Sequence, residues 1–498
     1  MGVSLVIRGG TIATPYGDGV RSGPGTITVD GDRIARVAWG PEADRVTTTP
    51  ADRVIDARTA VVIPGLVDAH SHCYGSLIPG LIDRLPLDVR RPFLAVCTDG
   101  WTERDTRAAV LLAAWRMLRS GTTTVNENSA QGLDAVEPSI RALLQSGMRA
   151  VVSAMVADRP VADTMPGYLD RLPDPLRRQV LDAPASPPAR ELVERSLAIA
   201  RRWHGAEGRV SVCLSPWAPY GCSDRLLELV GDASRAHSLT VHTHLLETRA
   251  QAAAARRLYG TSMVEHIAAL GLLSERFSAA HAVWLSDRDL DLLADSGAAI
   301  SHNPLSNLYL GSGIARVPEL LRRGVPVGIG SDGPNCGSTA SLFEVMKLAA
   351  LVHRLREPAA ARWVSPDQAF RMATIGGARA LNLEREIGSI EEGKKADLVL
   401  LDAGAPELVP LNDPIWQLVY GESGSAVTTV IVDGEVVLEN GRPTRLDTAL
   451  LRREAEEVGR GLAEHGRTAL ARISPLEPYL NEAYRALLRE FDEGGSPS

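Results

Sequence analysis

The stretch VVIPGLVDAHSH, residues 61–72, decides the fold of this chain. Its apolar part, residues 61–67, predicts a buried strand, and the polar residues 68–72 follow directly. Side chains two residues apart on a strand point to the same side, so the imidazoles of His70 and His72 aim at one spot beyond the strand end. This arrangement can hold a divalent metal ion.

Seven further strand candidates follow, and helical patterns such as 106–120 and 342–355 separate most of them. The candidates are residues 122–126, 150–156, 210–214, 240–244, 278–282, 299–301 and 327–330. Eight strand–helix units predict an α/β fold, a (β/α)8 TIM barrel over residues 61–387. The active site of such a barrel lies at the carboxyl ends of its strands.

The two ends of the chain have a different pattern. Residues 1–60 and 388–445 contain short strands joined by tight turns, including Asp-Gly turns. We expect them to form one small β-sandwich domain. Residues 446–498 predict a C-terminal helical extension, whose amphipathic segment 449–472 packs on the barrel or on a neighbouring subunit. The proline-rich connection 157–190 is either a substrate lid or a surface insertion.

Composition excludes several classes of function. The net charge of −8 over 498 residues argues against a nucleic-acid partner, which would need a basic stripe. No uncharged apolar run approaches the ~20 residues of a membrane helix. Residues 1–14 do not resemble a secretory signal, and five scattered cysteines do not suggest a disulfide framework. We therefore expect a cytoplasmic protein with a small-molecule substrate.

Residues that could bind a metal recur where the predicted strands end. They are His242 and His244, Glu247 shortly after them, His281, His302, and Asp332. Spacing alone does not settle which of His242 and His244 faces the site. A single histidine at a strand end is as often a hydrogen-bonded core residue, but five coincident strand ends favour a metal centre.

These motifs resemble the metal-dependent amidohydrolase superfamily. Within it, the chain is similar to the branch of adenosylhomocysteine/methylthioadenosine deaminases, guanine deaminases and triazine hydrolases (chlorohydrolases). The resemblance rests on PGLVDAHSH at 64–72, GTTT at 121–124, HLLET at 244–248, His281, SHNPLSNL at 301–308, GSDG at 330–333 and GSIEEGKKADL at 388–398.

The resemblance implies a ligand set of three histidines and one carboxylate, namely His70, His72, His244 and Asp332. Such a set with one open position is typical of a catalytic site, and both Zn²⁺, the favoured ion, and Fe²⁺ suit it. Two-metal relatives bridge their ions with a modified lysine at the end of the fourth strand. Residues 210–215 contain no lysine, so we predict one metal ion per subunit.

The resemblance also assigns the catalytic roles. Glu247 would take a proton from the attacking water and pass it to the substrate. His281 would hydrogen-bond the water or the substrate, and Asp332 could hold a proton in transit.

The predicted substrate contacts are His302, Asn303, Trp217 and Tyr74. Nucleoside deaminases of this branch have a histidine where this chain has Trp217, which makes an adenosine-type substrate doubtful. Trp217 could instead stack on a flat heterocycle, or it could be a packing residue. Three arginines after the first strand, Arg84, Arg90 and Arg91, belong to a solvated face or meet an acidic group.

The leading prediction is a metal-dependent aminohydrolase that deaminates a nitrogen heterocycle with metal-activated water and releases ammonia. The alternative is another bond at the same site: opening of a cyclic amide or imide, or displacement of chloride or an alkylamine from a triazine. A distant alternative is a metal-free binding or scaffold homologue, but the retained ligand residues argue against it. The resemblance implies a homodimer or higher homo-oligomer.

Overall fold

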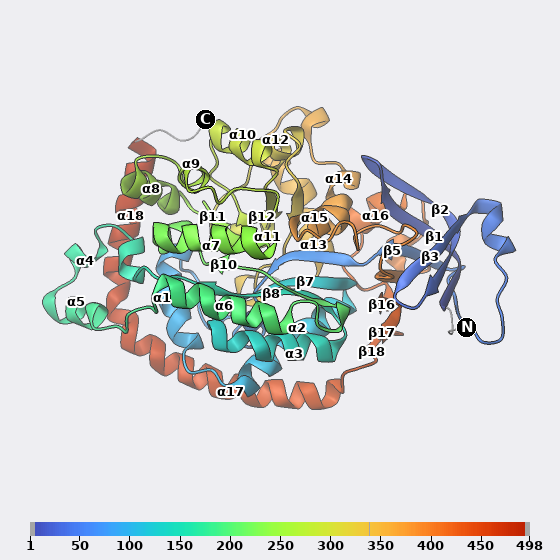
Figure 1. Cartoon of the computed structure of the whole chain (residues 1–498), viewed down its shortest axis with the longest axis horizontal. Coiled ribbons are helices and arrows are strands. Elements are labelled where there is room, and N and C mark those ends of the chain that lie inside the picture. The colour runs from blue at the N-terminus through green and yellow to red at the C-terminus, as the bar shows by residue number, and fades with distance from the viewer. Residues whose placement is uncertain (1–4, 338, 494–498) are drawn as a thin grey trace.

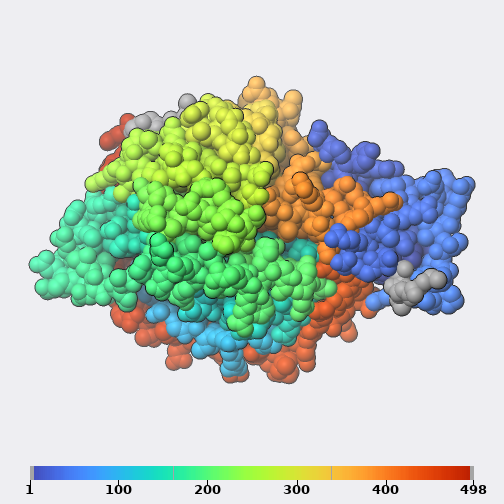
Figure 2. Space-filling model, in the orientation of Figure 1, coloured from blue at the N-terminus to red at the C-terminus, as the bar shows by residue number. Residues whose placement is uncertain are grey.

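The computed structural model describes residues 5–337 and 339–493 of the chain. It is an α/β protein in which helices surround parallel strands, and a strand-rich part lies at one end of the molecule (Figure 1). The space-filling view shows the same division, with the blue N-terminal strands forming one end of the elongated molecule (Figure 2).

Both ends of the chain contribute to one nine-stranded sheet. Its order is β18-β17-β16-β15-β5-β1-β2-β3, with β4 paired to β1. The strands are β1 (Leu5–Tyr16), β2 (Gly19–Asp30), β3 (Arg33–Trp39), β4 (Arg53–Asp56), β5 (Ala60–Pro64), β15 (Leu398–Asp402), β16 (Val427–Val432), β17 (Glu435–Glu439) and β18 (Arg442–Pro443). The sheet has its own apolar core, which joins residues such as Ile27 and Val62 to Leu398 and Ile431.

Two parallel sheets carry the middle of the chain. One contains β6 (Leu66–Ser71), β7 (Thr122–Ser129), β8 (Arg149–Val156), β9 (Val210–Val212) and β10 (Ser215–Pro216). The other contains β11 (Val241–Leu245), β12 (Phe277–His281), β13 (Ala299–His302) and β14 (Val327–Ile329). All eight regions in which we expected parallel strands contain one.

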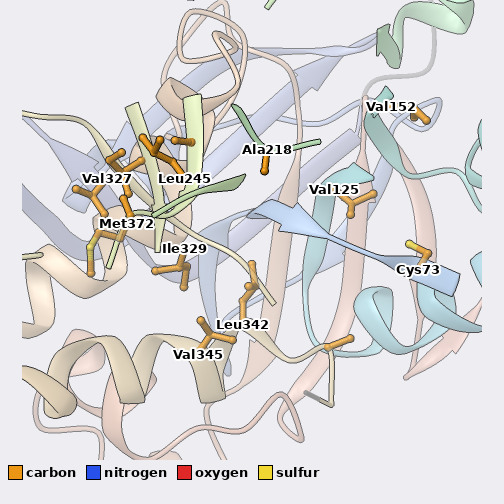
Figure 3. Packing of buried hydrophobic residues seen from close by; sticks show 14 of the residues in the cluster. Cys73, Val125, Val152, Ala218, Leu245, Val327, Ile329, Leu342, Val345 and Met372 are labelled. Atoms are coloured by element: carbon orange, nitrogen blue, oxygen red, sulfur yellow. The ribbon is translucent and has the colours of Figure 1, made fainter. Parts of the chain in front are cut away.

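Hydrogen bonds connect the two parallel sheets on both sides. On one side, the Asp332 amide donates to the His70 carbonyl (2.9 Å) and the His72 amide to the Asp332 carbonyl (3.1 Å). On the other, the His242 amide donates to the Leu214 carbonyl (2.9 Å). Side chains from both sheets pack into the large apolar core, as the close view shows for Val125, Leu245 and Ile329 (Figure 3).

The first predicted strand is divided in the structure. Residues 60–64 form β5 of the nine-stranded sheet, and the parallel strand β6 begins only at Leu66. Gly65 lies between them in a tight space, because a Cβ atom there would come within 2.1 Å of Thr123 Oγ1. The single apolar run therefore serves two sheets, which hydropathy alone does not reveal.

Helices cover the parallel strands. They are α1 (Leu87–Thr98), α2 (Glu103–Arg119), α3 (Val136–Ser146), α4 (Tyr168–Arg171), α5 (Asp174–Leu181), α6 (Ala189–Trp203), α7 (Asp224–His237), α8 (Arg249–Tyr259), α9 (Met263–Ala269), α10 (Asp287–Ser296), α11 (Pro304–Tyr309), α12 (Val317–Arg322), α13 (Leu342–Leu351), α14 (Pro366–Arg371), α15 (Gly377–Ala380), α16 (Pro414–Tyr420), α17 (Thr448–Ile473) and α18 (Glu477–Glu493). None of these helices has the length and apolar character that a bilayer span requires.

The C-terminal helices pack on the body of the same chain. Helix α17 lies against α1 and α2, and α18 lies against α8, α1 and α4 (Figure 1). The long connection 157–190 contains α4 and α5, which form the left edge of the view in Figure 1.

Buried ion pairs join the nine-stranded sheet to the parallel strands. Arg149, at the start of β8, donates to both carboxylate oxygens of Asp397 (2.9 and 3.2 Å) and to Asp433. Arg209, before β9, pairs with Asp433 (3.0 Å) and Glu435 (2.9 Å). These arginines lie at the amino ends of their strands, so the contact between the sheets is on the side opposite to the strand ends that carry the histidines.

Candidate metal centre

The carboxyl ends of the parallel strands bring five predicted site residues together. His70 lies near the end of β6 and His72 just beyond it, His244 lies near the end of β11, His281 ends β12, and Asp332 follows β14. Each side chain is at least nine-tenths buried. Two overlapping groups, His70–His244–His281 and His70–His72–Asp332, each have possible ligand atoms within 4.8 Å of one another.

The distances show that the side chains converge on one point. Nε2 of His72 lies 3.2 Å from Nε2 of His244 and 3.5 Å from Oδ1 of Asp332. Nε2 of His70 lies 3.8 Å from the same carboxylate oxygen. Three ring nitrogens and one carboxylate therefore face a common centre.

Backbone carbonyls fix the tautomers of two of these histidines. Nδ1 of His72 lies 2.7 Å from the Asn128 carbonyl, and Nδ1 of His244 lies 2.7 Å from the Trp217 carbonyl. A carbonyl only accepts hydrogen bonds, so each Nδ1 carries a hydrogen, and in the neutral form of either ring Nε2 has a lone pair. Two lone pairs that face each other at 3.2 Å repel unless a cation lies between them.

Hydrogen-bond contacts distinguish His70, which faces the centre, from His242, which lies behind it. Nδ1 of His70 lies 2.9 Å from Nε2 of His242, whose Nδ1 in turn lies 2.7 Å from Ser278 Oγ. Nε2 of His70 is buried and has no hydrogen-bond partner. Of the two histidines of β11, His244 thus faces the centre and His242 lies behind His70, a distinction that spacing left open.

The donor set fits a divalent cation. Burial and the neighbouring histidines lower the pKa of His70 and of His244 well below the ordinary value. Both imidazoles are therefore neutral and can offer a lone pair. Three imidazoles and one carboxylate, with outer hydrogen bonds that orient the rings, are typical of catalytic zinc and iron sites.

Glu247 and His281 form the second part of the site. Glu247 Oε2 lies 3.5 Å from His281 Nε2, which is itself 4.0 Å from Asp332 Oδ2. Burial, with the nearby charge of Asp332, raises the pKa of Glu247 well above its usual value. The Nδ1 atom of His281 lies 2.8 Å from Asn307 Oδ1, so Nδ1 carries the hydrogen and Nε2 faces the cavity as an acceptor.

Other residues position this site, and sequence reasoning did not assign them. Asp68 accepts hydrogen bonds from the Ser331 amide (3.0 Å) and hydroxyl (2.5 Å), and so joins the ends of β6 and β14 next to two predicted ligands. Burial raises the pKa of Asp68 to about 7. The Asn128 side chain accepts from Ser153 (2.9 Å) and Ser215 (3.2 Å), which holds the carbonyl that orients His72. For Asp68 and Asn128, the sequence indicated only that polar residues lie at the end of each predicted strand.

Two of the converging residues have unusual backbone conformations. His281 has φ = 72° and Asp332 has φ = 57°, in the left-handed region that residues other than glycine adopt uncommonly, although Asn, Asp and His do so more often than the rest. Such strain is retained where the surrounding structure requires it, most often at functional sites. Here it turns both side chains toward the centre directly after their strands.

A cavity of about 250 Å³ opens onto the centre. Its lining includes four of the five converging residues, Glu247, and two predicted substrate contacts, Tyr74 and Trp217. The ring of Trp217 is covered by the Arg91 guanidinium, whose carbon lies 3.4 Å from the ring centroid. One face of this indole is therefore occupied by Arg91, and the role of Trp217 as a substrate contact stays a prediction.

His302 and Asn303 lie deeper than the other predicted residues. Both are buried, and neither belongs to the lining of this cavity. Asn303 Nδ2 lies 3.4 Å from His281 Nδ1, and the His302 ring lies 5.2 Å from that of His353, centroid to centroid. Their role as substrate contacts stays a prediction.

Comparison with known proteins places this centre in a family context. The model of the Amidohydrolase family matches residues 61–437. The chain is 33% identical to the 5′-deoxyadenosine deaminase of Methanosarcina mazei over 92% of this chain and 98% of the relative. It is 35% identical to the 5-methylthioadenosine/S-adenosylhomocysteine deaminase of Moorella thermoacetica over 85% of this chain and 92% of the relative.

A solved structure agrees with these relatives. The zinc-bound adenosine deaminase from Xanthomonas campestris superposes with a TM-score of 0.82 at 29% identity, over 92% of this chain and 98% of that structure. The family model matches most of the chain, and the relatives are more than 30% identical to it along nearly their whole length. The chain belongs to the amidohydrolase family.

Proposed function

We propose that this protein is a metal-dependent aminohydrolase that removes an exocyclic amino group from a nitrogen heterocycle, with adenine nucleosides as the first substrate class to test. One observation carries the proposal: His70, His72, His244 and Asp332 converge at the end of a cavity that Glu247 and His281 also line. The adenine-nucleoside deaminases among its relatives support the choice of substrate class.

The ligands that we propose are His70, His72, His244 and Asp332, which would hold one divalent ion, Zn²⁺ in preference to Fe²⁺. When bound, the ion supplies Lewis-acid chemistry that acidifies a water molecule in the cavity. Two observations support this assignment. The Nε2 atoms of His72 and His244 face each other at 3.2 Å, and Nε2 of His70 is buried without a hydrogen-bond partner.

Glu247 is the proton carrier in this proposal. Burial raises its pKa, so this carboxylate is a stronger base than an exposed glutamate and holds a proton more readily. It would take a proton from the attacking water and give it to a ring nitrogen, which makes the neighbouring amidine carbon more electrophilic. A second proton, from the hydroxyl group now bound to that carbon, would pass to the amino group. The C–N bond then breaks as the carbonyl forms, and the amino group leaves as ammonia.

His281 orients the reacting groups. Its Nδ1–H donates to Asn307, which fixes the ring and turns Nε2 toward Glu247 and Asp332. Nε2 can then accept a hydrogen bond from the attacking water and hold it at the ring carbon.

The finer architecture is part of the same proposal. The hydrogen bonds on both sides of the two parallel sheets support a closed (β/α)8 barrel over residues 61–387. Residues 1–60 with 388–445 would form a small β-sandwich domain, and 446–498 a helical extension. A homodimer or larger homo-oligomer is also proposed, and light scattering of the purified protein tests it.

Ammonia release is the decisive test. The zinc-loaded protein would be assayed with adenosine, 5′-deoxyadenosine, 5-methylthioadenosine, guanine and an aminotriazine, with Glu247→Gln as the control that retains the predicted ligands. Release from at least one amino heterocycle, lost in Glu247→Gln, supports the proposal. Chloride, alkylamine or ring-opened product without ammonia would support hydrolysis of a different bond at the same centre.

A further inference from the structure

One positively charged side chain lines the cavity beside the proposed metal centre. Arg91, on α1, is the sole arginine or lysine among the described lining residues, and the wall around it is largely apolar: Leu87, Leu94, Met155, Ala157 and Leu310. An isolated charge in such a wall is unfavourable unless solvent or a partner satisfies it.

The position of this guanidinium is fixed by its neighbours. Its Nη1 donates to the Tyr220 hydroxyl (3.1 Å) and to Thr164 Oγ1 (3.4 Å). Its plane lies against Trp217, with the guanidinium carbon 3.4 Å from the ring centroid. Arginine stacked on an aromatic ring loses little further freedom when it binds a ligand.

The charge of Arg91 is not paired within the described ranges. Asp88 and Glu247 are near enough to feel its field, but neither forms an ion pair with it. Because Nη1 is engaged in the hydrogen bonds to Tyr220 and Thr164, Nε and Nη2 remain as donors for a ligand. These two atoms form one edge of the guanidinium, and that edge matches the two oxygens of a carboxylate.

We propose that Arg91 selects substrates that carry a carboxylate on the side of the heterocycle away from the departing amino group. The inference rests on the proposed function, because it names a substrate feature at the same site. Glu247, Asp332 and the histidines occupy the reacting end of the cavity, so the amino-bearing carbon would lie there. Arg91 over Trp217 then meets the opposite substituent, and Trp217 acts through Arg91 as a positioning residue.

The neighbouring arginines provide the contrast. Arg84 is almost fully exposed, with 93% of its side chain accessible, and does not line the cavity. Arg90 is buried and donates to the Asn335 carbonyl (2.8 Å) and weakly to Cys336 Sγ. Of the three arginines after β6, Arg91 alone combines a place in the cavity wall with an unpaired edge.

Matched ligands test the proposal. Binding of adenine-9-acetate and its neutral carboxamide, and of 2-aminopyrimidine-5-carboxylate and its carboxamide, would be measured by titration calorimetry on zinc-loaded Glu247→Gln protein. Turnover in this variant is expected to be about 10²–10⁴-fold lower, and titration calorimetry measures binding itself rather than a reaction rate. A hydrogen bond to a charged group predicts at least about tenfold tighter binding of a carboxylate than of its amide.

Three variants separate the explanations. Arg91→Gln should abolish the preference for the carboxylate and leave amide binding within about threefold, because only the charge and its edge are lost. Arg91→Lys should keep part of the preference, since the charge remains without the bidentate edge. Arg84→Gln, an exposed charge in the same segment, should change neither affinity and is the matched control.

The outcomes separate this inference from the proposed function. Three results would each overturn the role of Arg91. They are no preference for the carboxylate ligand when Arg91 is present, an equal loss of affinity for carboxylate and amide in Arg91→Gln, and no measurable carboxylate binding at millimolar concentration. Ammonia release without a carboxylate preference would leave the deaminase standing and remove this inference. A carboxylate preference without ammonia release from any heterocycle would retain the anion site and remove deamination.

Discussion

The two histidines of β11 allow a sharp test of the metal centre, because they differ in role while lying two residues apart. His244 faces His72 across 3.2 Å, whereas His242 lies behind His70 and contacts its Nδ1 at 2.9 Å. We predict that His244→Ala removes a ligand, and that His242→Ala leaves all ligands in place but frees the ring of His70.

The magnitudes follow from these positions. Removing a hydrogen-bond partner that orients a metal-binding histidine lowers metal affinity about 10–100-fold. A metal present at about 1,000 times its Kd stabilises the folded protein by about 4.1 kcal/mol. In His242→Ala the same metal concentration would then contribute about 1.4–2.7 kcal/mol. In His244→Ala, which loses a ligand, we expect a smaller contribution than in His242→Ala.

The assay combines metal content with unfolding. Each variant would be stripped with a chelator, reloaded with zinc, and analysed by mass spectrometry for bound metal and by urea unfolding with and without zinc. The expected order of zinc-dependent stabilisation is wild type, His242→Ala, then His244→Ala. The difference between loaded and stripped protein cancels any packing effect of the alanine itself.

The reverse order would refute the geometric argument. If His242→Ala lost its zinc and His244→Ala kept it, the carbonyl contact to His244 would be a structural hydrogen bond and His242 the ligand. Equal zinc-dependent stabilisation in both variants and wild type would show that neither ring supports a metal ion.

Three further changes have defined outcomes. Glu247→Gln should keep one equivalent of zinc and lose about 10²–10⁴-fold in turnover of any heterocycle from which the unsubstituted protein releases ammonia, since the amide cannot carry protons. Metal analysis and initial rates check this. Arg149→Met should lower the free energy of unfolding by about 3–5 kcal/mol, because it leaves the buried carboxylate of Asp397 without an arginine partner and Asp433 with Arg209 but without Arg149. Urea titration measures this loss, and a loss below about 1 kcal/mol would contradict the role of these ion pairs. Burial lowers the pKa of His353 to about 4, whereas a histidine in the unfolded chain has a pKa near 6.5. The unfolded chain therefore takes up this proton first, and the free energy of unfolding falls as the pH drops from about 6.5 to about 4. His353→Leu should remove up to about 3 kcal/mol of that fall, and an unchanged pH profile of stability would exclude the effect.

Much of the fold was predictable because local patterns repeat along the chain. Each of the eight predicted parallel-strand regions contains a strand, and both chain ends contribute to one sheet. The boundary at Gly65 was not predictable, because residues 60–67 remain apolar across a change of sheet. Only the close approach of Thr123 requires glycine and a break there.

The candidate site was predictable to the level of residue type and strand end. His70, His72, His281 and Asp332 follow apolar runs, and the carboxyl ends of parallel strands meet on one side, so convergence could be inferred before any distance was known. Asp68 and Asn128 gave no comparable signal. Their importance lies in contacts to residues far away in the chain, such as Ser331, Ser153 and Ser215.

The sequence by itself determined which side chains reach the end of each strand, because strand periodicity and the place of apolar runs are local properties. The tertiary structure decided the direction of each ring: that His244 and not His242 faces the centre, and that Arg91 lies over Trp217 in the cavity wall. Those directions depend on a backbone carbonyl or a guanidinium brought from another part of the chain. Such partners are set by packing, which spacing along one strand does not encode.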